Sequence, residues 1–183
     1  MAHLMMKYGL TVGIGILLLL NSACSSPQKL SYSEKMKRQR AYYSSLSEEE
    51  QVKAVKEYWW RIAFIKNPSY RVQKTALDIS PNAIEDIDHP TKEIQILAVH
   101  KIMKDGSYNT ALSKLINSFS EEAQIEAVIL NPQIIQYIPY PSSAVQLTAV
   151  RKNPYVIKNI INATDEAKKE AVRLNPRVAK YLR

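Results

Sequence analysis

The feature that most constrains the fold is a six-residue phrase that recurs every 22 residues in the C-terminal third of the chain. It reads Ala-Val-Ile-Leu-Asn-Pro from Ala127, Ala-Val-Arg-Lys-Asn-Pro from Ala149 and Ala-Val-Arg-Leu-Asn-Pro from Ala171. Self-similarity at a fixed short period indicates stacked copies of one supersecondary unit. The chain of 183 residues has room for one domain of ordinary size, and this domain is expected to be a stack of similar units.

The register of these alanines extends toward the N-terminus and gives six units. The intervals between successive alanines are 22, 22, 29, 22 and 22 residues, and Val or Leu follows each one. A Ser or Thr stands seven residues before every alanine, which is where a helix N-cap is expected. Ser47 and Glu50 also match the capping-box pattern. The predicted caps are Ser47, Ser69, Thr91, Ser120, Ser142 and Thr164.

Each unit is predicted to hold two short helices. The Asn-Pro pair begins the second one, because Pro is well tolerated in the first turn. Gln stands four residues after five of the six caps, with Lys168 in the last unit, and predicts a ladder of side chains bonded to neighbouring turns. Neither helix is long enough to be stable alone, so stacking must supply the stability. The predicted fold is all-α, with a repeat domain over residues 47–183.

The Ala-Val-x-x-Asn-Pro phrase with its aliphatic tail resembles short-period all-α repeat families. These are the leucine-rich repeat variant and a related bacterial and phage repeat of unknown function. The leucine-rich variant usually has Arg where this chain has Gln, and its period is slightly longer. The resemblance implies a short right-handed α-solenoid of six two-helix repeats, used for interactions and with no activity attached.

The N-terminus predicts export. Lys7 precedes an apolar run over residues 8–20, and Asn21-Ser22-Ala23-Cys24 follows. This pattern is typical of a secretory signal peptide, here residues 1–23, and the run is too short for a membrane-spanning helix. The position of Cys24 resembles the lipobox of bacterial lipoproteins, although Asn21 stands where that family usually has Leu. The resemblance implies that Cys24 is acylated, palmitate included, and anchors the chain at the outer membrane, on its periplasmic face or at the cell surface. An ordinary signal peptide followed by a free cysteine is the alternative.

Residues 24–46 are predicted to form a basic, flexible tether. Glu34 is their only acid, and no sustained helical apolar stripe is present. Such a segment is favourable beside anionic headgroups. A solvated spacer is the alternative. The basic residues are Lys29, Lys35, Lys37, Arg38 and Arg40.

The repeat pattern fails in the first unit, where Tyr58-Trp59-Trp60 replaces Asn-Pro. We interpret this as an aromatic N-terminal cap that seals the core. The alternative is a contact for a partner or for the membrane interface.

The pattern also fails in the third unit, which carries seven extra residues and no Asn-Pro. Gly106 is predicted to be the left-handed residue that ends a lengthened helix. The insertion would divide the array into two sets of three, and insertions in repeat arrays often lie on a binding face. The candidate contact residues are Lys104, Asp105, Gly106 and Tyr108.

Positive charge gathers at the C-terminal end. The formal net charge is +8, yet residues 47–150 hold 10 basic and 13 acidic residues, against 9 basic and 3 acidic in residues 151–183. This end is either a patch for an anionic partner or a solvated cap that terminates the array. The candidate binding residues are Arg151, Lys152, Lys169, Arg173 and Arg177.

The sequence indicates no catalytic site, cofactor or metal. Only His89 and His100 would remain after processing, and neither has a partner at metal-ligand spacing. The leading hypothesis is a non-catalytic protein-interaction module, held to the bilayer through acylated Cys24 and bound to an envelope protein. Its most specific form is a receptor-blocking or exclusion lipoprotein. The alternative is a lipoprotein that binds anionic glycan, lipopolysaccharide or peptidoglycan through the basic end. Nucleic acid is not expected as a partner.

Overall fold

The computed structural model describes residues 30–105 and 111–182, and this part of the chain is helical throughout, without a strand. The predicted signal peptide and Cys24 lie outside the described residues. α-Helices alternate with short 3-10 helices along most of the chain. The elements are α2 (Tyr32–Ser45), α3 (Glu48–Glu57), η1 (Trp59–Phe64), α4 (Tyr70–Ile79), η2 (Pro81–Glu85), α5 (Lys92–Asp105), α6 (Ala111–Leu115), η3 (Ile116–Ser118), α7 (Glu121–Leu130), η4 (Pro132–Tyr137), α8 (Ser143–Lys152), η5 (Pro154–Asn159), α9 (Asp165–Leu174) and η6 (Pro176–Tyr181).

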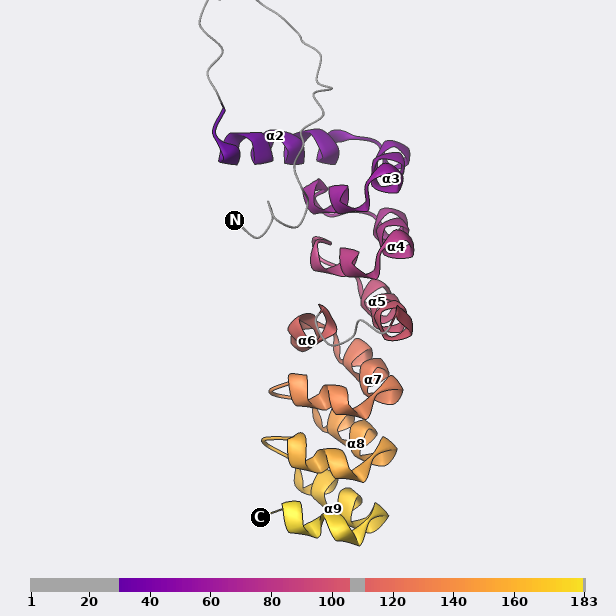
Figure 1. Cartoon of the computed structure of the whole chain (residues 1–183), viewed down its shortest axis with the longest axis vertical. Coiled ribbons are helices and arrows are strands. Elements are labelled where there is room, and N and C mark those ends of the chain that lie inside the picture. The colour runs from indigo at the N-terminus through magenta and orange to yellow at the C-terminus, as the bar shows by residue number, and fades with distance from the viewer. Residues whose placement is uncertain (1–29, 106–110, 183) are drawn as a thin grey trace, which may run out of the picture.

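The helices form an elongated stack with two columns (Figure 1). The α-helices from α3 to α9 make one column, apart from α6, and the 3-10 helices make the other. Successive members are in contact: α3 with α4, α7 with α8 and α8 with α9 in the first column, and η4 with η5 and η5 with η6 in the second. α2 lies across the N-terminal end of the stack.

All six predicted caps are confirmed. Each hydroxyl oxygen accepts a hydrogen bond from the backbone N–H three residues later, at donor–acceptor distances of 3.2 to 3.4 Å. Ser47 and Glu50 form the predicted capping box. These bonds satisfy backbone donors that would otherwise lack a partner in the first turn, and so they fix where each α-helix begins.

The Asn-Pro pairs begin the second helices as predicted. The side-chain oxygens of Asn131, Asn153 and Asn175 each accept the backbone N–H two residues later, at 3.0 Å. Ser80 occupies the same place before Pro81 but makes no side-chain cap bond. These second helices are 3-10 helices of five or six residues, a type the sequence pattern did not specify. The tighter i→i+3 winding suits such short connectors.

The predicted glutamine ladder is present. Nε2 of each ladder Gln donates to the carbonyl just before its own cap, at 2.7 to 3.2 Å. Oε1 of Gln95 and of Gln146 accepts the backbone N–H of the next unit's cap, Ser120 and Thr164, at 2.6 and 2.8 Å. One side chain therefore bonds to two successive units.

Buried apolar residues run the whole length of the array as one cluster, from Val52 to Val178. The six repeating alanines are all buried, none more than 8% exposed. Their small side chains allow the α-helices to approach closely. The aliphatic residue after each alanine is fully buried in the first five units, whereas Val172 in the last unit is only half-buried. Among the described helices none packs beyond α9 and η6, which explains this difference.

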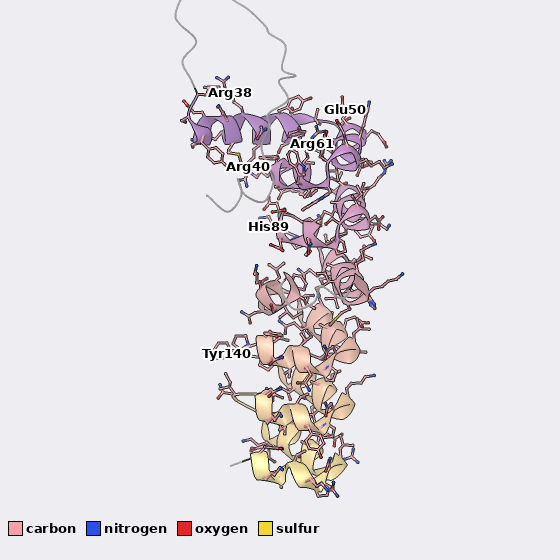
Figure 2. The ribbon with its side chains drawn as sticks, viewed as in Figure 1. Arg38, Arg40, Glu50, Arg61, His89 and Tyr140 are labelled. Atoms are coloured by element: carbon pink, nitrogen blue, oxygen red, sulfur yellow. The ribbon has the colours of Figure 1, made fainter. Side chains whose placement is uncertain are left out.

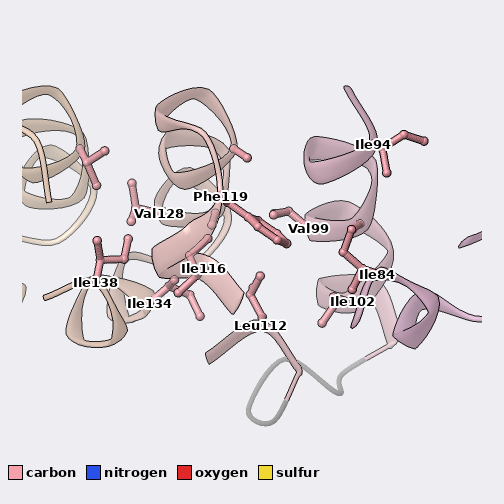
Figure 3. Packing of buried hydrophobic residues seen from close by; sticks show 14 of the residues in the cluster. Ile84, Ile94, Val99, Ile102, Leu112, Ile116, Phe119, Val128, Ile134 and Ile138 are labelled. Carbon is pink, nitrogen blue, oxygen red and sulfur yellow. The ribbon is translucent and has the colours of Figure 1, made fainter. Parts of the chain in front are cut away.

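The third unit accommodates its extra residues without breaking the core. α5 is 14 residues long and contacts α7 directly, so the α-helix column continues. α6 contacts η2 and η4, and thus lies in the 3-10 column. Figure 3 shows Leu112 and Ile116, both fully buried, between Ile102 and Ile134. The chain therefore builds a second-column layer here from α6 and η3, where other units use one 3-10 helix.

Residues 32–45 differ from the predicted tether, because they form the 14-residue helix α2. A capping box of Ser31 and Glu34 begins it, with the Ser31 N–H donating to Glu34 at 2.8 Å and the Glu34 N–H to Ser31 at 3.2 Å. Sequence reasoning relied on an apolar stripe, and α2 has no buried residue. Its C-terminal end is held by packing of Tyr43 against Phe64, with ring centroids 6.0 Å apart.

Candidate functional site

The aromatic segment of the first unit is organised around Arg61. The guanidinium lies over the rings of Tyr58, Tyr43 and Trp60, at 4.6, 5.7 and 6.0 Å from their centroids. Its Nη1 donates to the carbonyl of Ala54 at 3.3 Å and to the Glu57 carboxylate at 2.6 Å. The cluster joins α2, α3 and η1 through cation–π contacts.

This packing supports the cap interpretation for Tyr58, Trp59 and Trp60. Both tryptophans are half-buried, and Trp60 packs edge-on against Phe64 with centroids 6.1 Å apart. Tyr58 is 48% exposed and is the member of the three most open to a partner. A binding role for the three residues stays a prediction.

The insertion residues fall at a boundary of the described chain. Lys104 lies exposed in the last turn of α5, and Asp105 is the final residue of that helix. Gly106 and Tyr108 lie outside the described residues, as does the predicted left-handed turn.

The predicted basic patch is divided between the two columns. Arg151 and Arg173 converge on one carboxylate, Glu170, with Nε–oxygen distances of 3.2 and 2.7 Å. Hydrogen bonds from Arg173 and then Arg151 lower the pKa of Glu170 to about 2. Lys152 and Lys169 are exposed on the same column, whereas Arg177 lies on η6, in the other.

Charges on the α-helix column are paired across units. Lys101 Nζ lies 3.0 Å from the Asp78 carboxylate one unit earlier, and His100 Nε2 lies 3.0 Å from that of Glu126 one unit later. Arg71 binds Glu49 through Nη2 at 3.0 Å. Several charges on this side are therefore opposed by a neighbouring unit.

In the last three units, the surface formed by the 3-10 column differs in charge from the α-helix column. We call this surface the η face. It consists of η4, η5 and η6 with the loops that follow η4 and η5, residues 131–142, 153–163 and 175–182. These residues include Lys158, Arg177 and Lys180 but no acid. Nζ of Lys180 and of Lys158 lies 4.9 and 5.8 Å from the ring centroid of Tyr181.

Two large apolar side chains stand at the loop tips of the η face. Tyr140 and Ile161 are each 84% exposed, more than any other large hydrophobic residue in the described chain. They belong to successive units, and their loops protrude side by side from the 3-10 column in Figure 1. Figure 2 shows Tyr140 at this edge. The sequence pattern did not single out these two residues, because each looks like an ordinary loop residue until its neighbour's position is known.

A groove that the sequence also did not indicate lies beneath α2. Ala41 of α2 lines it together with Ala63 and Ile65 near the end of η1, and the turn before α5 closes one side. Its volume of about 460 Å³ falls within the range of small-molecule sites. It was missed because residues 24–46 were expected to be a tether. The Ser-x-x-Glu pattern at Ser31 was the available signal for a helix there.

Within residues 30–105 and 111–182, no group of three or more His, Cys, Asp or Glu is placed to hold a metal ion. In that same part of the chain, no helix has the length and apolarity needed to cross a bilayer. No protein-family model matches the chain, and no curated protein or solved structure matches it either.

Proposed function

We propose that the protein is a lipid-anchored, non-catalytic interaction module of the bacterial envelope. In this proposal Cys24 carries the acyl chains, and residues 47–183 form a right-handed solenoid of six units that presents the η face to another envelope protein. A receptor-blocking or exclusion lipoprotein is one specific form of this activity.

The observation that carries the proposal is the contrast between buried and exposed positions of the repeat. Alanine is buried at the same place in all six units. By contrast, the position two residues before each cap is exposed in every unit and varies in type. Its occupants are Ser45, Asn67, His89, Ser118, Tyr140 and Asn162. A scaffold that keeps its core constant and varies one exposed row is suited to recognition.

The contact face is tested by replacing its most exposed apolar side chains. We expect the double variant Tyr140→Gln and Ile161→Gln to lose most of the protein that is captured by crosslinking in intact cells. The matched control is Leu130→Gln with Leu174→Gln, which are 44% and 40% exposed on the α-helix column. Equal capture by wild type, variant and control would rule out the η face as the contact.

The anchor is tested separately. A Cys24→Ser chain should leave the membrane fraction and should lack the acyl mass found on the wild-type N-terminal peptide by mass spectrometry. Two or more acyl chains give stable attachment, whereas one chain is marginal. A wild-type chain whose Cys24 thiol is free would refute the proposed lipid anchor. The proposed protein interaction would not be affected by that result.

The absence of acids from the η face, within the described residues, favours a second candidate function, the binding of an anionic glycan. Tyr155 and Tyr181 are 38% and 40% exposed, Tyr181 lies beside Lys158 and Lys180, and aromatic rings with cations suit a charged sugar polymer. We expect Arg177→Gln with Lys180→Gln to weaken sedimentation with peptidoglycan or lipopolysaccharide. Lys152→Gln with Lys169→Gln, on the other column, is the control. Binding should fall as salt rises above about 0.1 M, where the screening length is about 10 Å. Salt-independent binding would contradict this candidate.

A further inference from the structure

The groove beneath α2 is bordered by two cations, Arg40 and Lys66. Arg40 lies on α2 and Lys66 follows η1, and neither forms an ion pair with any residue of the described chain. Figure 2 shows Arg40 on the side of α2 that faces the stack, with His89 below it along the same edge, whereas Arg38 lies on the opposite side. Both cations therefore contribute positive electrostatic potential at the opening of this groove.

A hydrogen-bonded clamp fixes the spacing of these cations. The backbone N–H of Lys66 donates to Ser44 Oγ at 2.9 Å, and that hydroxyl donates to the carbonyl of Phe64 at 3.3 Å. Arg40 is four residues before Ser44 and thus shares its face of α2. The clamp fixes the backbone from which each cation extends to the groove before any ligand arrives, so only the two side chains must be ordered on binding.

The acidic side chain that lines the groove, Asp88, makes its contacts with Asn67 and His89. Asp88 accepts the backbone N–H of Asn67 at 3.4 Å, and its other carboxylate oxygen lies 3.5 Å from His89 Nε2. Asn67 and His89 occupy equivalent places in successive units and both have left-handed backbone, with φ of 48° and 51°. This conformation is uncommon outside glycine and is tolerated best by Asn, Asp and His. With Arg40 and Lys66 opposing one carboxylate, the groove keeps a net positive charge even when His89 is neutral.

The rest of the groove lining is apolar apart from Ser44, whose hydroxyl forms the clamp. Ala41 is exposed and Ala63 is half-buried, and their small side chains leave the groove open, whereas Ile65 is 1% exposed and lies behind them. A bare inorganic anion gains nothing from such walls, while an apolar stem attached to the anion gains about fourfold in affinity per buried CH₂ group.

We propose that this groove binds a phosphate group that carries an apolar substituent. Arg40 and Lys66 contact the phosphate oxygens, since guanidinium and ammonium groups form charge-assisted bonds to phosphate. The apolar stem lies against Ala41 and Ala63. The phosphate belongs to a lipid headgroup or to a soluble monoester, and the site does not depend on the interaction proposed for the η face.

The test is calorimetric titration of the purified full chain with hexyl phosphate and with inorganic phosphate. We expect saturable binding of hexyl phosphate at least about tenfold tighter than that of inorganic phosphate, the gain from burying two CH₂ groups. Arg40→Gln with Lys66→Gln should weaken hexyl phosphate binding by about tenfold or more. Arg38→Gln with Lys53→Gln removes the same charge elsewhere and should leave the affinity unchanged.

Further experiments distinguish the contribution of the apolar stem from that of the phosphate, and a lipid source of the phosphate from a soluble source. Ala63→Leu fills the apolar part and should weaken hexyl phosphate binding while sparing inorganic phosphate. A lipid source predicts that phosphatidic acid in phosphatidylcholine vesicles displaces hexyl phosphate, and a soluble source predicts that it does not; either result supports the site. Equal affinity for the two phosphates, no saturable binding, or the same loss in the control as in the Arg40 and Lys66 variant would overturn the proposal.

Discussion

The backbone N–H of Thr164 donates to Oε1 of Gln146, one unit earlier, across 2.8 Å. Nε2 of the same Gln146 side chain donates to the carbonyl of Pro141 at 2.9 Å. Gln146 is 3% exposed, so these bonds are shielded from water. A single buried amide therefore connects the start of one α-helix to the start of the next, and it holds neighbouring units in register.

Replacing Gln146 with Leu keeps the volume but removes these two bonds and a longer one, of 3.4 Å, from Nε2 to the carbonyl of Asn162. The carbonyl of Pro141 and the N–H of Thr164 would be left without that partner, at a cost of about 1–3 kcal/mol for an unsatisfied buried group. We expect the free energy of unfolding to fall by that amount in urea denaturation.

Lys168 supplies the internal control for this prediction. It holds the ladder position in the last unit, and no unit follows it within the described chain. Lys168→Leu should change stability by less than about 0.5 kcal/mol, as for a surface substitution. A similar loss in both variants would show that Gln146 does not act through the contact between units.

The caps give a second prediction. Ser142 accepts the backbone N–H of Val145 at 3.3 Å, and its hydroxyl also donates to Glu121 of the preceding unit. Ser142→Ala should lower the free energy of unfolding by about 1 kcal/mol, the usual cost of a lost N-cap. Ser143→Ala changes the adjacent exposed serine and serves as the control. If the two variants melt at the same temperature, the hydroxyl at position 142 is not a stabilising cap.

The Arg151–Glu170–Arg173 group gives a pH dependence. The pKa of Glu170 is about 2 in the folded chain against an ordinary value of 4.5, because Arg173 and Arg151 bond to its charged form. A lowered folded-state pKa contributes stability that is fully present above the unfolded-state pKa and is lost as the pH falls through the folded-state value. Wild type should therefore melt above Glu170→Gln at neutral pH, and the gap should close between about pH 4.5 and pH 2. A gap that stays constant over this range would show that the carboxylate charge is not responsible.

The helical register could be predicted from the sequence because local chemistry repeats. A hydroxyl at each cap, a small residue at each close approach and Asn-Pro at the second helix of the last three units are readable one unit at a time, and all six caps lie where the pattern placed them. The ladder role of Gln was predictable for the same reason.

Features that depend on more than one segment could not be predicted in this way. The groove needs α2 against η1, and α2 carries only a weak apolar pattern, so its packing through Tyr43 and Ser44 was not visible. The basic C-terminal residues formed one group along the sequence, but the turn at Asn175 places Arg177 on η6, away from Arg151 on α8. Net charge in a window of sequence does not show which side of a two-column stack each residue occupies.

The central claim is that the η face is where the protein meets its partner. The most direct measurement is site-specific photo-crosslinking in intact cells, with a photoreactive residue placed singly at Tyr140, Ile161, Leu130 or Leu174. The account predicts that Tyr140 and Ile161 give the same discrete crosslinked protein, and that Leu130 and Leu174 on the α-helix column give none. A discrete product from Leu130 or Leu174, with none from Tyr140 or Ile161, would contradict it.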